Sequence, residues 1–202
     1  MKKYELTNET KEINGCTLHR IVAVRDFADV KAGDKGGWIE SEENLSQEDT
    51  CWVGDNAQVY GGARVYGNSA VHDDAQVHDD AQVYGRALIG GNGQVYGYGQ
   101  VCGDARVYGD ARVYGNARVY GTARVCGDAI VGSDEDYIIF KNWWSSGRYF
   151  TWTRSNNMWR VGCFYGTGEE LIKKAYKDGK RSGREYERIV RYVDEILKSK
   201  DK

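Results

Sequence analysis

Aliphatic residues recur at every sixth position between residues 53 and 131. The positions are Val53, Val59, Val65, Val71, Val77, Val83, Ile89, Val95, Val101, Val107, Val113, Val119, Val125 and Val131. A small residue stands two places before nearly every one, and the consensus is Ala-Arg/Gln-Val-Tyr-Gly-Asp/Asn. Small and aliphatic residues thus alternate with polar ones, as in a strand with one buried face. The Gly, Asn and Asp that follow favour tight corners. We predict short strands that coil into a parallel β-helix with Ala and Val inside.

The unbroken six-residue pattern resembles the left-handed β-helix of hexapeptide-repeat proteins. This resemblance implies triangular coils of about eighteen residues, so that outward residues eighteen apart stack in columns on three faces. The left hand of the coil is implied by the resemblance alone, because connections between parallel strands are usually right-handed. The predicted fold is mainly β: a left-handed parallel β-helix with an N-terminal β cap and a small C-terminal α+β domain.

Changes in composition divide the chain into three segments. Residues 1–50 are predicted as an N-terminal β cap and lead-in coil, 51–132 as the β-helix, and 133–202 as antiparallel strands plus a helical hairpin. Strands are expected at 4–7 and 17–25, and Asn14-Gly15 is a turn signal. Ile39 and Leu45 lie six apart and predict an irregular first coil. A cap is required because the end of a solenoid exposes apolar interior and unpaired strand edges.

The C-terminal segment predicts three strands followed by two helices. The strands are expected at 137–144, 148–153 and 158–164, with aromatic side chains that close the top of the solenoid. Thr167 is placed to cap a helix over 168–178, with Glu169 and Glu170 in its first turn. Ser182 is placed to cap a second helix over 183–198, which has an apolar stripe at helical spacing.

One of the three faces interrupts the regular columns. On it Ala70 and Leu88 replace Gln or Arg, and Gly90 replaces Tyr. An apolar patch on a polar prism predicts that something covers it, either a neighbouring subunit or the N-terminal cap. A subunit is favoured because hexapeptide-repeat proteins commonly form trimers. The candidate oligomer interface consists of Trp52, Ala70, His72, Leu88 and Gly90.

The Arg and Tyr columns have two interpretations. Guanidinium groups and rings could bind phosphate and bases of a nucleotide. Stacked tyrosines also stabilise a solenoid without any ligand, and this structural interpretation is favoured. The exposed tryptophans and a basic row on the last helix are further binding candidates, although such a row is commonly a solvated face. The candidate ligand or partner residues are Arg106, Tyr108, Arg112, Tyr114, Arg118, Tyr120, Arg124, Trp143, Trp144, Arg184, Arg188 and Arg191.

Two copies of a His-Asp-Asp unit, at 72–74 and 78–80, are the candidates for metal binding or catalysis within the repeats. His72 and His78 are weak candidates for a metal, because residues six apart point from adjacent faces and could share an ion only across a subunit interface. Either could also be the base of a hexapeptide acyltransferase, whose acyl donor lies along a groove between subunits. Two features count against acyl transfer: Tyr follows most aliphatic positions and would crowd that groove, and no long loop interrupts the repeats. We therefore predict no catalytic residue, no metal and no cofactor.

Composition narrows the setting further. The formal net charge of −2 gives no evidence for nucleic-acid binding, but does not exclude it. The absence of a long apolar run and of a signal-peptide pattern predicts a cytoplasmic protein without a membrane partner. The odd number of cysteines, with no CxxC pair, fits reduced thiols.

The whole chain resembles a group of phage and prophage proteins of unsettled activity. The likeness lies in the lead-in 31–40, in Asn44-Leu-Ser46, in the repeats, and in the stretches 150–154 and 159–168. It implies a phage or mobile-element origin. From this resemblance and from the absence of a convincing catalytic set, we predict a non-enzymatic phage accessory protein that binds a host protein or a signalling nucleotide, plausibly to antagonise a host defence. The resemblance also implies the host cytoplasm as location. A homo-oligomer is expected, with a trimer favoured. The alternatives are a trimeric acyltransferase-like enzyme and a structural virion component.

Overall fold

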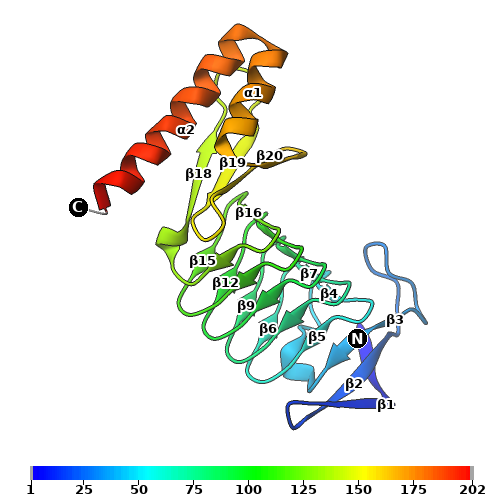
Figure 1. The fold of residues 1–202 in the computed structure, drawn as a ribbon. Helices are drawn as coiled ribbons and strands as arrows, with labels where there is room; N and C mark the ends of the chain where they lie inside the picture. The colour runs from blue at the N-terminus through cyan, green and yellow to red at the C-terminus, as the bar shows by residue number, and fades with distance from the viewer. Residues whose placement is uncertain (1, 201–202) are drawn as a thin grey trace.

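The computed structural model describes residues 2–200 as an elongated molecule in three parts. A β-hairpin region lies at one end, a stack of short parallel strands forms the middle, and a small sheet with two helices lies at the other end (Figure 1). None of the helices within 2–200 is long and apolar enough to cross a membrane.

The N-terminal region extends one sheet of the solenoid. Its elements are β1 (Tyr4–Ile13), β2 (Cys16–Ala23), β3 (Lys35–Ile39) and the 3₁₀-helix η1 (Glu42–Asn44). The hairpin turns at Asn14 and Gly15, with φ of 51° and 83°. The predicted lead-in coil is present, because Ile39 pairs with Val59 and Leu45 forms a bridge with Val65. The strand at β1 is longer than the sequence pattern predicts.

The solenoid consists of two-residue strands joined by corners. They are β4 (Trp52–Val53), β5 (Gln58–Val59), β6 (Arg64–Val65), β7 (Ala70–Val71), β8 (Gln76–Val77), β9 (Gln82–Val83), β10 (Leu88–Ile89), β11 (Gln94–Val95), β12 (Gln100–Val101), β13 (Arg106–Val107), β14 (Arg112–Val113), β15 (Arg118–Val119), β16 (Arg124–Val125) and β17 (Ile130–Val131). Each strand pairs in parallel with the strand three places further on, as Leu88 with Arg106 shows. The predicted eighteen-residue parallel coil is therefore confirmed, while its left hand stays a prediction of the resemblance.

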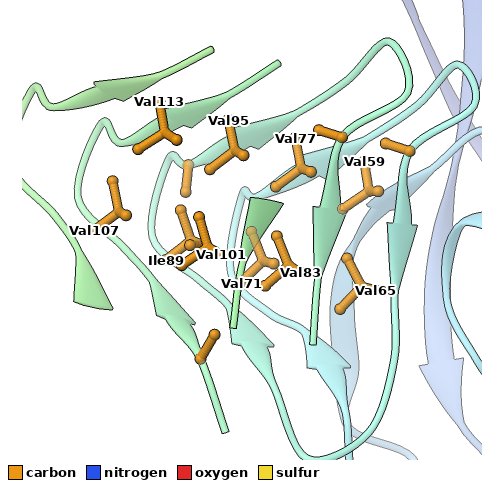
Figure 2. Packing of buried hydrophobic residues seen from close by; sticks show 14 of the residues in the cluster. Val59, Val65, Val71, Val77, Val83, Ile89, Val95, Val101, Val107 and Val113 are labelled. Atoms are coloured by element: carbon orange, nitrogen blue, oxygen red, sulfur yellow. The ribbon is translucent and has the colours of Figure 1, made fainter. Parts of the chain in front are cut away.

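Valine and alanine fill the interior, as the hexad predicts. Val59, Val77, Val95 and Val113 form one inward row, and rows from the other sheets meet it (Figure 2). All of the aliphatic hexad positions are buried. Burying each valine contributes roughly 1.5–3 kcal/mol of hydrophobic free energy relative to leaving it exposed.

Backbone hydrogen bonds join each coil to the next. The parallel pairing of residues such as Val59 and Val77 requires bonds in both directions, and further amides beside these pairs donate from one coil to the next. The amide of Gln58 donates to the carbonyl of Ala75 in the next coil, and that of Gln76 donates to Gly93 beyond it. The first coil has no coil before it and the last coil has none after it, so backbone groups at both ends lack a partner within the repeat. Because buried backbone groups need partners, both ends require caps.

Donors from the N-terminal region meet the acceptors of the first coil. The bonds are Trp38 N to Ala57 O, Asn44 Nδ2 to Gly61 O and Ala63 O, and Lys3 Nζ to Cys51 O. Lys3 is completely buried, and this burial lowers the pKa of its ammonium group.

Acceptors from the C-terminal region meet the donors of the last coil. The bonds are Arg118 N to Asp134 Oδ1, Arg124 N to Thr151 Oγ1, Ile130 N to Ser155 Oγ, and Gly132 N to Asp136 Oδ2. Asp134 and Asp136 bound the 3₁₀-helix η2 (Asp134–Asp136), which leads out of the solenoid.

The C-terminal sheet contains four strands, so the prediction of three is wrong. They are β18 (Tyr137–Lys141), β19 (Tyr149–Thr153), β20 (Met158–Val161) and β21 (Phe164–Gly166), antiparallel in that order. Gly162, with φ of 60°, makes a turn that divides the expected strand at 158–164 in two. The aromatic side chains of this sheet pack mainly against the two helices. They form a core separate from that of the solenoid, built around Phe150, Trp152 and Trp159.

Two helices follow the sheet. Helix α1 (Gly168–Asp178) has the predicted bounds, and Thr167 caps it in a capping box with Glu170. Helix α2 (Lys180–Lys200) starts earlier than predicted, so Ser182 lies inside the helix and does not cap it. The reason is that Gly179 alone joins the two helices.

The capping donors make a testable contribution to stability. Asn44 is buried, donates to two carbonyls of the first coil and accepts from the amide of Ser41. We expect Asn44→Ala to lower the free energy of unfolding by about 1–3 kcal/mol, because it leaves buried carbonyls without donors. Urea unfolding followed by circular dichroism measures this. The control is Glu43→Ala at the neighbouring exposed position, and equal unfolding midpoints for the two variants would contradict the capping role.

Candidate active site on the third face

The face built by β4, β7, β10, β13 and β16, here called the third face, carries a hollow of about 260 Å³. His72 and Asp73 lie on one side of it, Leu88 and Gly90 form its floor, and arginines and Tyr108 lie on the other side. These residues come from four successive coils and from the C-terminal sheet, and the regular stacking of the repeat brings the coil residues together.

Gly90 creates the space. It occupies the outward position that is Tyr in the consensus repeat. A Cβ atom at Gly90 would lie 2.4 Å from Cε1 and 2.9 Å from Nε2 of His72. The ring of His72 therefore lies against the bare backbone of Gly90, in space that any other side chain would take.

Hydrogen bonds fix the orientation of the His72 ring. Its Nδ1 lies 2.9 Å from Oδ2 of Asp73, and because a carboxylate only accepts, Nδ1 carries the proton. In the neutral imidazole Nε2 is then the nitrogen without a proton, on the side of the ring nearest Gly90.

Asp73 itself is held in place by the coil. It sits at a corner with φ of 59°, and its Oδ2 also accepts from the amide of Gly91 at 2.7 Å. The Gly91 amide, and after it His72, hold the pKa of the Asp73 carboxyl below its usual value. Asp73 therefore remains ionised at neutral pH and favours the Nδ1–H form of His72.

The second His-Asp-Asp unit has a different environment. The ring of His78 is stacked between Tyr60 and Tyr96, with centroids 5.1 and 5.2 Å away, and Tyr114 continues this ladder. Its Nδ1 lies 3.3 Å from Asp79, but no hollow adjoins it among those found in residues 2–200. His78 replaces a tyrosine in a structural stack, whereas His72 borders open space.

A set of possible metal ligands also includes His72. Asp55, His72 and Asp73 place one ligand atom each within 4.8 Å of one another. The sequence interpretation allowed His72 and His78 to share a metal only across subunits, whereas these three groups lie in one chain because corners eighteen residues apart are stacked. Asp55 already accepts from the amide of Asp73, so its carboxylate also supports the corner.

Several arginines lie beside the hollow. Arg106 and Arg124 come from the third face, and Arg160 of β20 lies over the ring of Tyr108, 5.4 Å from its centroid. A second hollow of about 360 Å³ is lined by Arg106, Arg124 and Arg148. Sequence reasoning missed Arg148 and Arg160, because no repeat or motif relates the C-terminal strands to the third face.

The other candidate residues lie elsewhere. Arg112 and Tyr114 project from the sheet of β14, and Arg118 and Tyr120 from that of β15; all four are exposed. Trp52 is packed edge-on against Phe27, with centroids 5.4 Å apart, so the N-terminal region covers that end of the third face. Ala70 pairs with Leu88 below the hollow.

The helical candidates form a separate group. Trp143 is 80 % exposed and borders a small hollow with Trp144 and Arg188. Arg188 pairs with Glu185, and Arg191 pairs with Glu169 and Asp194. Arg184 is exposed on the same helix. None of these residues lines the hollow on the third face.

Comparison with known proteins supports the repeat architecture. Residues 57–73, 100–113 and 111–122 match the model of the YdcK β-solenoid repeat. A similar protein is the "Uncharacterized acetyltransferase YdcK" of Escherichia coli K12, 40 % identical over 70 residues, which are 30 % of this chain and 22 % of that protein. The chain thus matches about a fifth of that relative's length. With the coil geometry, these matches support a parallel β-solenoid built of hexapeptide repeats.

The same comparison corrects the predicted function. The prediction of a non-enzymatic phage protein that binds a host factor or nucleotide is wrong, since the relative is named an acetyltransferase and favours the acyltransferase-like alternative. The sequence argument failed because it judged the groove from the Tyr that follows most aliphatic positions and gave too little weight to the exceptions. On the third face those positions are Gly54, His72 and Gly90 below Tyr108, so that part carries no tyrosine ring. A phage origin stays a prediction.

The geometry around Gly90 predicts how a single methyl group acts. We expect Gly90→Ala to move the His72 ring away from Asp73, because the new Cβ needs the space of Cε1, while the fold remains intact. Long-range proton–nitrogen NMR of the imidazoles should show the Nδ1–H tautomer of His72 in the original protein and its loss in the variant. Gly54→Ala is the matched control, since its Cβ would lie 3.5 Å from Trp52 and 4.0 Å from Cβ of His72, which are ordinary contact distances. Unchanged His72 signals in Gly90→Ala would disprove this arrangement.

Proposed function

We propose that this chain is an acyltransferase-like enzyme in which His72 is the general base. The observation that carries the proposal is the His72–Asp73 pair, with Nε2 of His72 beside the hollow over Gly90. The hexapeptide-repeat fold and the similarity to a protein named an acetyltransferase support it.

The chemistry follows from the protonation of the ring. An acceptor hydroxyl or amine in the hollow gives its proton to Nε2 and attacks the carbonyl carbon of an acyl thioester. The carbon–sulfur bond then breaks, and the proton on Nε2 passes to the departing thiolate, which leaves as a thiol. Asp73 stabilises the imidazolium that exists between these steps. General-base catalysis of this kind contributes typically about 10²–10⁴-fold in rate.

The third face also has room for a substrate. Gly54 and Gly90 carry no side chain, so no ring projects from the face in the coils on either side of His72. On the face of β5, β8, β11 and β14, tyrosine or histidine rings fill the equivalent positions. An acyl donor can therefore approach His72 along this face without displacing a ring.

We also propose that the protein assembles as a trimer through this face. Leu88 and Ala70 are only partly buried there, and an apolar stretch beside a hollow suits contact with a second copy. In that arrangement the neighbouring copy closes one side of the hollow.

Replacing His72 tests the proposed chemistry. We expect His72→Gln to lower kcat for transfer from acetyl-CoA to an amine or hydroxyl acceptor by at least about 10²-fold, because glutamine cannot take up the proton. The release of free thiol measures the rate. His78→Tyr is the matched control, since it restores the consensus ring to the stack, and its kcat should stay within about twofold of the original. Equal loss in both variants, or no loss in His72→Gln, refutes the role of His72.

Replacing Leu88 tests the proposed assembly. Leu88→Asp places a charge on the partly buried contact, so we expect the protein to elute from a size-exclusion column as a monomer while the original elutes as a trimer. Multi-angle light scattering gives the two masses. Arg112→Asp on another face is the control. A trimer that survives Leu88→Asp, or an original protein that is monomeric, counts against this interface.

A further inference from the structure

Two arginines on the third face are direct neighbours. Arg106 and Arg124 are register partners in the parallel strands β13 and β16. Within β4–β17 no other rung pairs arginine with arginine; Arg112 pairs with Gln94 and Ile130, and Arg118 with Gln100. Like charges directly opposite in a sheet are destabilising unless something neutralises them.

The C-terminal sheet adds two more guanidinium groups to this place. Arg160 borders the hollow beside His72, and Arg148 borders the second hollow. Arg106 and Arg124 line both hollows, so the four side chains lie around two adjoining hollows. Positive charge is thus gathered from two distant parts of the chain.

Among residues 2–200 no carboxylate forms an ion pair with any of these four arginines. The acidic side chains that line the two hollows are Asp73 and Asp104. Asp73 is bonded to His72 and Gly91, and Asp104 binds Arg86 through both oxygens, at 2.7 and 2.9 Å. The excess positive charge is therefore not balanced by these carboxylates.

Two of the arginines are also held in fixed positions. Nη1 of Arg124 donates to the carbonyl of Gly162 at 3.1 Å. Arg160 lies over the ring of Tyr108, and its Nε is buried without a hydrogen-bond partner. The packing of Arg160 against Tyr108 thus holds its guanidinium group at the edge of the hollow.

We propose that Arg106, Arg124, Arg148 and Arg160 bind a diphosphate group, and that this group belongs to the acyl acceptor whose nucleophile reaches His72. The assignment to the acceptor rests on the proposed acyltransferase function; the binding of a diphosphate does not. Two phosphates suit the site because Arg106 and Arg124 lie between the two hollows, with Arg160 on one side and Arg148 on the other. Guanidinium groups bind phosphate oxygens in pairs, which gives geometric selectivity.

Isothermal titration with inorganic pyrophosphate and inorganic phosphate, at one fixed ionic strength, tests the site directly. We expect pyrophosphate to bind at least about tenfold more tightly than phosphate, because it can engage both hollows. Arg106→Gln and Arg160→Gln should each weaken pyrophosphate at least about tenfold. Gln is the native residue at several equivalent rungs, so Arg106→Gln suits the fold.

Arg112→Gln is the matched control, at the same repeat position on another face, and should change pyrophosphate affinity less than about twofold. Equal weakening by Arg112→Gln, or no weakening by Arg106→Gln and Arg160→Gln, overturns the site. His72→Gln should bind pyrophosphate as the original protein does. If the original protein binds pyrophosphate but transfers no acyl group, the proposed acyltransferase function is wrong and the diphosphate site remains.

Competition identifies the source of the diphosphate. A nucleoside diphosphate that displaces pyrophosphate, together with coenzyme A that does not, supports the acceptor. Coenzyme A that displaces pyrophosphate overturns the acceptor assignment and gives the diphosphate to the donor.

Discussion

The hydrogen bonding between coils is the constraint on which the structure depends. Each coil satisfies backbone groups of its neighbours, so groups without a partner in the repeat remain at the first and last coils. The N-terminal region supplies amides, Asn44 and Lys3 to the first coil. The C-terminal region supplies acceptors from Asp134, Thr151 and Ser155 to the last coil, and Tyr137 donates to the carbonyl of Arg118. The caps are thereby part of the solenoid's hydrogen bonding as well as covers for its core.

Periodicity explains what could be predicted from the sequence. The register of the coils, the buried valines and the Thr167 cap depend on residues close in sequence or eighteen apart, so spacing alone predicts them. The turn at Gly162 and the early start of α2 depend on packing in the C-terminal core, which no period describes. The site was predictable only in part: His72 and Gly90 stand out as departures from the repeat, whereas Arg148 and Arg160 reach the third face through the fold of a separate sheet.

The repeat and its departures have different roles. Where the consensus is kept, rings stack on rings, and even a histidine at position 78 serves only to continue the stack. Because Gly90 carries no ring, its backbone lines a hollow, and Nε2 of the neighbouring His72 is not covered by a stacked ring. The same chemical unit, His-Asp-Asp, thus has two environments because of what lies one coil above it. Function in such a molecule depends on the columns rather than on any local motif.

The open ends of the repeat have a consequence for self-association. A molecule without either cap would display unpaired backbone groups at both ends of its stack. Such molecules would match each other in register, since the coils share an eighteen-residue repeat, and could stack end to end into a filament of unlimited length. The two caps therefore also act as stoppers that keep the rod at a finite length.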